Sequence, residues 1–339
     1  MNNKSLKRQK YSTKVKEDIY QIVLPTSFPV GPVNVYLIEG DLLTLVDTGP
    51  KTDEAWEILI KGIEETGYQL KDIQQILITH HHVDHSGLLE RIRKISGAQT
   101  LGHPLLVPHL QFDNKFLEYR NRFFANLYTE CGVPKEYHNH YAEEQELIQT
   151  LVEPSQVDIK LGHRQQVPGL KEWEVLYTPG HSQDHLSIFR KRDGVFLGGD
   201  HIIEHISSNA LIEPPIDPAN KANERPMTLV QYRTALEMCA DEEIQIVFSG
   251  HGVPVLNHRE LIHERLKSNW RRTEKIRKLL KEGPKTVFEI TGLLFPNIFE
   301  RELNLTISET LGHLDLLKLV YQVEVQENQG VSYYSIKNY

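Results

Sequence analysis

Short apolar runs bounded by polar or turn-forming residues recur through the first three quarters of the chain. Runs of β-branched and aliphatic residues of this length are typical of buried strands. They occupy residues 19–24, 34–39, 42–46, 73–78, 99–102, 156–159, 174–177, 187–189, 194–197 and 244–248. Apolar positions recur at helical spacing over residues 53–66 and from Leu88 to about residue 96. We therefore expect the chain to open as an antiparallel sheet and to continue with further strands and helices.

A longer helical pattern covers residues 103–151. Its apolar and aromatic positions recur at spacings of three and four: Phe112, Phe116, Tyr119, Phe123, Phe124, Leu127 and Tyr128. This periodicity predicts an amphipathic helical insert. Because the insert follows closely on a histidine-rich turn, we expect it to pack mostly on the sheet and to hold one aromatic face over that turn as a lid.

The composition changes again from Arg259 onward. A basic helical segment runs over residues 265–281, a second helix is predicted over 286–294 and a third over 308–319. Two strand-like runs, 320–326 and 331–336, are joined through Asn328-Gln329-Gly330. Three helices and a hairpin resemble a winged helix. The predicted organisation is a disordered lead-in (1–17), a main domain (18–258, containing the insert) and a small α+β winged-helix-like domain (259–339).

Bulk properties are those of an ordinary globular protein. The chain has 339 residues, 39% hydrophobic and 25% charged, with a formal net charge of -8. An acidic balance argues against a general nucleic-acid binder. Two distant cysteines, Cys131 and Cys239, do not form a disulfide framework. With no apolar leader in residues 1–16 and no run long enough to span a membrane, we expect a cytoplasmic protein without a membrane partner.

The candidate chemistry begins where the apolar run 73–78 ends. Four histidines and an aspartate follow within a few residues, from His80 to His85. Imidazole nitrogen and carboxylate oxygen are ligands of zinc and similar metals. His80 and His82 are two residues apart and can bind one metal ion, whereas Asp84 and His85 follow the turn and can bind a second. His81 points the other way and is interpreted as a non-ligand.

Three further strand ends carry the same residue types. Thr178-Pro179-Gly180 precedes His181, Gly198-Gly199 precedes Asp200, and Ser249-Gly250 precedes His251. Glycine next to such a residue lets backbone and side chain approach a metal closely. A lone histidine of this kind is usually structural, but four strand ends that each deliver His or Asp are hard to explain by packing. The repetition therefore predicts one shared metal site.

The motif order H-x-H-x-D-H, T-P-G-H, G-D and G-H resembles that of the metallo-β-lactamase superfamily over about residues 19–257. The resemblance implies an α/β fold, a four-layer αβ/βα sandwich with the site at the edge of its two sheets. It also implies that His80, His82 and His181 bind one metal, that Asp84, His85 and His251 bind another, and that Asp200 bridges them. Zinc is the expected metal, with iron and manganese as alternatives.

Asp47, at the end of an earlier strand, has two interpretations. In the first interpretation, it is a turn and helix-capping residue ahead of the helix over residues 53–66. It is also placed to accept a hydrogen bond from a metal-bound histidine or its loop. The two roles are compatible.

The leading functional hypothesis is a dinuclear metal hydrolase acting on a small ester or thioester, as in relatives that resemble glyoxalase II. Two cations generate hydroxide near neutral pH, and the leaving group takes its proton from water or from Asp84. Asp200 stands where β-lactamases of this fold usually carry cysteine, which argues against antibiotic hydrolysis. The alternatives are a phosphodiesterase or ribonuclease and a mononuclear iron persulfide dioxygenase. We expect a small-molecule substrate and interpret the C-terminal basic segment as packing or homo-oligomer contacts rather than nucleic-acid binding.

Overall fold

The computed structural model describes residues 10–216, 225–321 and 323–337. Its first sheet has seven strands in spatial order: β1 (Ser12–Lys16), β2 (Ile19–Leu24), β3 (Val33–Ile38), β4 (Thr44–Val46), β5 (Gln75–Leu77), β6 (Gln99–Gly102) and β7 (Ile159–Lys160). The sheet is antiparallel from β1 to β4 and parallel from β4 to β7. The predicted antiparallel opening is therefore confirmed.

A second sheet holds four strands in the order β11 (Ile246–Ser249), β10 (Val195–Gly199), β9 (Leu186–Arg190) and β8 (Trp173–Tyr177). The β10–β11 pair is parallel and the others are antiparallel. Its apolar side chains meet those of the first sheet in one buried cluster, in which Tyr36 and Ile38 lie with Trp173 and Ile188. The two sheets therefore pack face to face.

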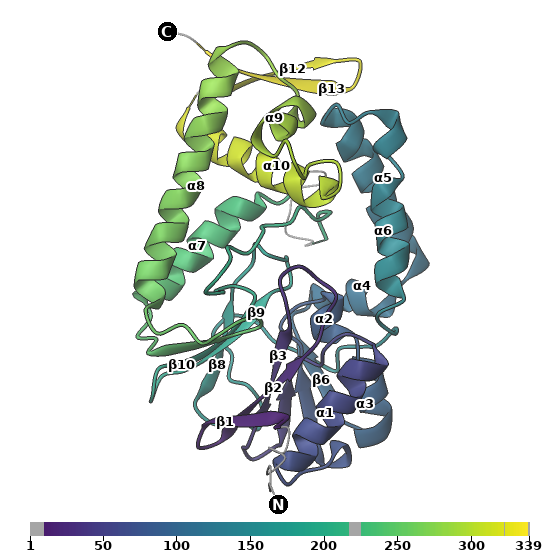
Figure 1. Cartoon of the computed structure of the whole chain (residues 1–339), viewed down its shortest axis with the longest axis vertical. Coiled ribbons are helices and arrows are strands. Elements are labelled where there is room, and N and C mark those ends of the chain that lie inside the picture. The colour runs from purple at the N-terminus through teal and green to yellow at the C-terminus, as the bar shows by residue number, and fades with distance from the viewer. Residues whose placement is uncertain (1–9, 217–224, 322, 338–339) are drawn as a thin grey trace, which may run out of the picture.

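Helices cover the outer face of each sheet. The helices of the described chain are α1 (Asp53–Glu65), α2 (Val83–Ser86), α3 (Leu89–Ser96), α4 (Leu106–Gln111), α5 (Asn114–Glu130), α6 (His140–Gln149), α7 (Thr228–Asp241), α8 (His258–Lys281), α9 (Val287–Leu294) and α10 (Leu303–Val320), with 3₁₀ turns at Leu70–Asp72 and Lys135–Tyr137. Val35 and Leu37 of β3 pack with α1 and α3, whereas their neighbours face the second sheet. The second sheet's outer residues pack against α7 and α8. The predicted four-layer αβ/βα sandwich is confirmed (Figure 1).

The expectation of a disordered lead-in over residues 1–17 is wrong for its last part. Ser12–Lys16 form strand β1, which pairs with β2. The backbone amides of Tyr11 and Ser12 donate to the Glu65 carboxylate of α1, which fixes this strand to the helix. Polar composition hides an edge strand of this kind, because its partners are backbone groups. Residues 1–9 lie outside the described residues.

The helical insert forms, but its aromatic residues do not pack mainly on the sheet. Phe124, Leu127 and Tyr128 of α5 are buried with residues of α8, α9 and α10. Only α4, through Leu106 and Leu110, joins the core on the first sheet. The insert therefore connects the sandwich to the C-terminal helices, and Figure 1 shows it alongside both. Periodicity indicates an apolar face, but it does not indicate which partner covers that face.

The C-terminal elements follow the predicted order of three helices and a hairpin, β12 (Val323–Asn328) and β13 (Val331–Ile336). The third helix, α10, begins at Leu303 rather than at Ser308, and two thirds of its eighteen residues are buried. It contacts both α7 and α8. The winged-helix assignment stays a prediction. None of the described helices combines the length and apolar character needed to cross a membrane.

Candidate metal centre

The predicted site residues come from strand ends of both sheets. His80 and His82 follow β5, and Asp84 and His85 lie on the short helix α2 directly after them. His181 follows β8, Asp200 follows β10 and His251 follows β11. Because these strands end at the same edge of the sandwich, residues far apart in the sequence meet there. The structure brings all seven predicted residues together.

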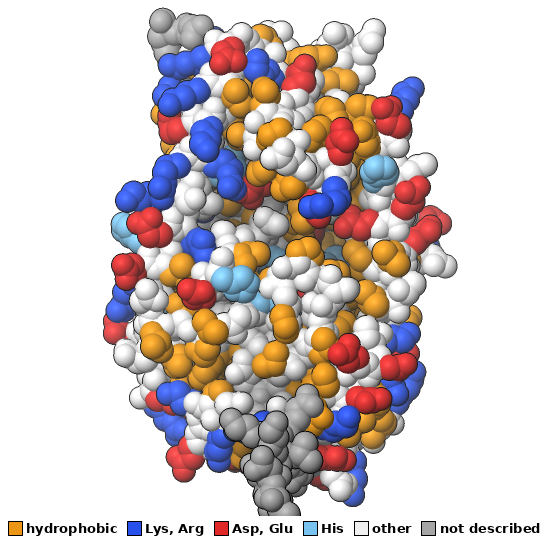
Figure 2. All heavy atoms as spheres, in the orientation of Figure 1, with side chains coloured by type: hydrophobic (Ala, Val, Ile, Leu, Met, Phe, Trp, Pro, Cys, Tyr) orange, Lys and Arg blue, Asp and Glu red, His pale blue; other side chains and the backbone are white. Residues whose placement is uncertain are grey.

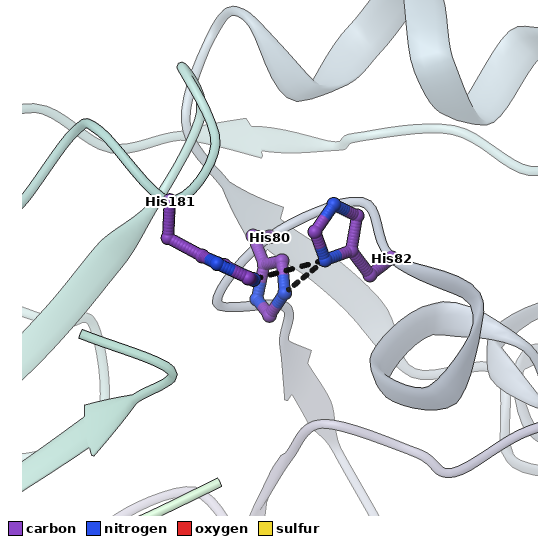
Figure 3. A group of neighbouring side chains, drawn as sticks. All are labelled: His80, His82 and His181. Carbon is purple, nitrogen blue, oxygen red and sulfur yellow. Dashed lines mark hydrogen bonds between the residues drawn. The ribbon is translucent and has the colours of Figure 1, made fainter. Parts of the chain in front are cut away.

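Three imidazoles form the first group (Figure 3). The Nδ1 atom of His82 lies 3.0 Å from Nε2 of His80 and 3.0 Å from Nε2 of His181. Burial, together with the neighbouring imidazoles, holds the pKa of His80 and His82 well below its ordinary value. These rings are therefore neutral at pH 7, which is the form in which imidazole binds a metal.

Asp84, His85 and His251 form the second group, in which potential ligand atoms lie within 4.8 Å of one another. Nε2 of His251 lies 3.3 Å from Oδ2 of Asp84. The carboxylate of Asp200 lies between the two groups: its Oδ1 is 3.3 Å from Nε2 of His85, and its Oδ2 is 3.5 Å from Nε2 of His181. Asp200 therefore has one oxygen beside a residue of each group.

Each histidine of the second group, and His181 of the first, has a hydrogen-bond acceptor behind its ring. Nδ1 of His85 donates to Asp47 Oδ2 at 2.8 Å, that of His181 to the Asn209 carbonyl at 2.9 Å, and that of His251 to the Pro32 carbonyl at 2.9 Å. A carbonyl oxygen can only accept a hydrogen bond, so the proton lies on Nδ1. Each Nε2 therefore faces the centre, where the neutral ring could bind a cation. Although burial lowers it, the charges of Asp200 and Asp84 raise the pKa of His85 and of His251.

Asp47 has the position predicted for a residue that holds the loop. Besides His85, its carboxylate accepts hydrogen bonds from the backbone amide and the hydroxyl of Thr79, each at 2.8 Å. It does not cap α1, because Thr52 accepts the hydrogen bond from Ala55 there. The capping interpretation is wrong, and the interpretation as a partner of a site histidine fits the geometry.

Glycine lets the strand ends approach one another. A Cβ on Gly250 would lie 2.3 Å from Oδ1 of Asp200, and one on Gly199 would lie 2.7 Å from Nε2 of His185. No side chain fits at such distances. The tight packing around Asp200 therefore requires glycine at both positions.

The donor set fits divalent cations. His85 Nε2, Asp200 Oδ1 and His251 Nε2 are buried and have no hydrogen-bond partner among the described residues. Orphaned buried polar atoms are costly, and three of them facing one centre indicate a missing partner. Although burial alone would raise it, the surrounding histidines hold the pKa of Asp200 well below its usual range, so its carboxylate is ionised. Imidazole nitrogens and ionised carboxylates together are typical zinc ligands.

The neighbouring histidines serve as supports. His185 is buried, and its Nε2 accepts a hydrogen bond from the backbone amide of Asp200 at 3.0 Å. His81 turns away from the centre, as predicted, and its Nδ1 lies 2.9 Å from Asp184. The sequence did not indicate Asn209, whose carbonyl accepts a hydrogen bond from His181. It also did not indicate Glu213, whose carboxylate accepts one from the backbone amide of Gln183. Neither residue lies in a recognisable motif, and Asn209 acts through its backbone carbonyl, so the sequence holds no signal for either.

The chain belongs to the metallo-beta-lactamase superfamily, whose family model matches residues 28–279. Members of this superfamily typically bind divalent metals, and the His and Asp groups described above could hold them.

Among individual proteins, the chain is similar to the probable metallo-hydrolase YqjP of Bacillus subtilis (strain 168), with 37% identity over 305 residues that cover 89% of this chain and 92% of YqjP. The probable metallo-hydrolase YflN of the same organism is 25% identical over 232 residues, covering 66% of this chain and 81% of YflN. Among solved structures, a metallo-beta-lactamase family protein from Thermus thermophilus matches 96% of this chain and 100% of its own, with a TM-score of 0.78 and 26% identity.

Proposed function

We propose that this protein is a dinuclear metal-dependent hydrolase that cleaves a small ester or thioester. The observation that carries this proposal is the Asp200 carboxylate, which lies with one oxygen beside His85 and the other beside His181. A carboxylate shared in this way suits a pair of cations rather than one. The similarity to YqjP, described as a probable metallo-hydrolase, supports the reaction class.

The residues have distinct roles in this proposal. His80, His82 and His181 would hold one cation, and Asp84, His85 and His251 the other. Two divalent cations, expected to be zinc, would supply a hydroxide-like nucleophile at neutral pH and electrostatic stabilisation of the developing negative charge. Asp47 fixes the ring of His85 through Nδ1 and so aims its Nε2. Asp84 carries a carboxylate at the edge of the centre that can accept and return a proton.

The phosphodiesterase or ribonuclease alternative is disfavoured by the surface of the C-terminal region. Most of α10 is buried, so this helix cannot enter a nucleic-acid groove. The basic side chains of α8 are paired in part: Lys267 and Arg271 with Glu264, and Arg277 with Glu274. Figure 2 shows Lys and Arg along this edge with acidic residues among them.

The test is hydrolysis of a thioester and of an RNA oligonucleotide by the wild type and by H82A and D200A, alongside the metal content. We expect thioester turnover that both substitutions reduce by more than about 100-fold. H263A, on an exposed position of α8, is the matched control and should change nothing. RNA cleavage without thioester cleavage would indicate the nuclease instead. Iron with oxygen uptake on a persulfide would indicate a dioxygenase.

A further inference from the structure

A buried group of ionisable side chains lies beside the three-histidine group and consists of His81, Asp184 and Glu213. Asp184 and Glu213 are buried, and the side chain of His81 is 19% exposed. Nδ1 of His81 donates to Oδ1 of Asp184 at 2.9 Å, and its Nε2 lies 3.6 Å from Oε1 of Glu213. Burying ionisable groups is costly, and apolar replacement of a buried ion pair is often neutral or stabilising. Stability alone therefore does not explain this group.

The bond between His81 and Asp184 connects two turns that carry candidate ligands. His81 directly precedes His82 on the turn after β5, and Asp184 follows His181 by three residues on the turn after β8. β5 belongs to the first sheet and β8 to the second. Nδ1 of His82 and Nε2 of His181 lie 3.0 Å apart across the same gap (Figure 3). The side-chain bond therefore spans the two sheets next to the ligands that have to converge.

Glu213 holds the second of these turns from another side. Its Oε2 accepts a hydrogen bond from the backbone amide of Gln183 at 2.9 Å. The segment of Glu213 also contains Asn209, whose carbonyl accepts the hydrogen bond from Nδ1 of His181. The turn after β8 is therefore held both by this segment and by His81.

The helical insert restricts the ring of His81. His109 of α4 is buried, and its ring stacks on that of His81 with the centroids 3.7 Å apart and an interplanar angle of 16°. Phe116 of α5 meets the ring of His109 edge-on at 5.0 Å. A ring packed in this way has little freedom to rotate, so Nδ1 of His81 stays directed at Asp184.

We propose that His81 and Asp184 are positioning residues for the first cation, because their hydrogen bond fixes the two turns on which His82 and His181 converge. The proposal rests on the dinuclear centre of the proposed function. It also explains why a histidine that is not a candidate ligand stands inside the histidine-rich turn. A purely structural pair could be replaced by apolar side chains without loss of metal affinity, whereas a positioning pair could not.

The zinc affinity of a full-length chain with a single cation site tests the pair. H251A removes a ligand of the second group, so the remaining zinc reports on the three histidines. In this background, H81F/D184L makes the pair apolar but keeps a ring at position 81. H81N keeps a donor for Asp184, because the amide nitrogen of asparagine takes the place of Nδ1. H313F is the matched control, since His313 is buried and pairs with Glu309 in the C-terminal region.

Competition with a chromogenic chelator should show zinc affinity about 10- to 100-fold lower in H81F/D184L than in the H251A parent. H81N and H313F should leave the affinity unchanged. D184N keeps the shape of the acceptor but loses its charge, so its affinity should lie between those of the parent and H81F/D184L. Thermal unfolding without metal establishes that each chain is folded before zinc is added.

The outcomes separate this inference from the proposed function. Unchanged zinc affinity in both H81F/D184L and D184N overturns the inference and leaves the proposed function standing. A loss in H81N as large as that in H81F/D184L also overturns it, because the hydrogen bond would then not be the cause. Weaker zinc binding in H81F/D184L alongside intact binding in H81N, without turnover of any ester or thioester by the wild type, supports the positioning pair and contradicts the proposed reaction.

Discussion

At the residue scale, the atoms behind each histidine decide what that histidine can do. Where Nδ1 donates to a carboxylate or a carbonyl, Nε2 faces the centre and is the atom that could bind a cation, as in His85, His181 and His251. The candidate ligands themselves follow from the motif. Their supports do not, because the Pro32 and Asn209 carbonyls are backbone atoms that every residue has. Only Asp47, a charged side chain at a strand end, could be predicted from the sequence.

The support by Asp47 leads to a prediction about metal affinity. D47N keeps the size of the side chain but replaces the charged acceptor of the His85 hydrogen bond by a neutral amide. We expect metal affinity to fall by about 10- to 100-fold, measured by competition with a chromogenic chelator. D53N is the control, because Asp53 is fully exposed on α1. Equal affinities in D47N and the wild type would show that Asp47 does not tune the site.

A second prediction concerns Glu213, which is buried beside Asp184. Burial, and then the charge of Asp184, raise the pKa of Glu213 from 4.5 to about 7. The folded chain therefore holds this proton more tightly than the unfolded chain, so the free energy of unfolding falls as the pH rises from about 4.5 to about 7. Glutamine cannot titrate and avoids this loss.

We therefore expect the free energy of unfolding of E213Q, relative to that of the wild type, to increase from pH 5 to pH 8 by up to about 3 kcal/mol. Urea unfolding at both pH values, with chelator present, measures the difference. E143Q, at an exposed position of α6, should show no such change with pH. A difference between E213Q and the wild type that is constant with pH would contradict the assignment.

At the element scale, the sequence predicts the existence and type of the elements better than their partners. The strand ends that carry the site can be predicted from the sequence, because the apolar runs stop shortly before its His and Asp residues. The apolar stripe on α5 is evident from the sequence, but its partner is a set of C-terminal helices more than a hundred residues later. Helical periodicity contains no information on such distant contacts. The edge strand β1 escapes prediction for a related reason, since backbone pairing holds it.

The packing of α5 can be tested by a core substitution. Phe124 is 3% exposed, and its ring stacks on Tyr141 at 3.6 Å between centroids. F124A should lower the free energy of unfolding by about 3–5 kcal/mol, as measured by urea denaturation. L147A, at an exposed position of α6, should change it by less than about 0.5 kcal/mol. A loss below about 1 kcal/mol in F124A would show that this contact is not part of the core.

At the scale of the whole molecule, the predicted boundary near residue 258 does not separate two independent cores. One buried cluster joins α5 to α8, α9 and α10. Another joins α7 and the second sheet to Ile262 of α8 and Leu316 of α10. The C-terminal helices are therefore part of the scaffold that holds the site, and composition alone could not reveal this.

Truncation tests this account of the scaffold. A chain ending at residue 257 would expose the apolar faces of α5 and α7, so we expect it to aggregate or to lose its cooperative thermal transition. Calorimetry and size-exclusion chromatography would detect either outcome. A soluble, cooperatively folded 1–257 chain that binds metal as the full chain does would show that the sandwich is self-sufficient.

We propose that seven residues from four strand ends bind a pair of divalent ions. The most direct measurement is the metal-to-protein ratio of the purified full chain, wild type and H251A, by elemental analysis. We predict about two equivalents in the wild type and about one in H251A, because His251 belongs only to the second group. One equivalent in both proteins would contradict the dinuclear centre.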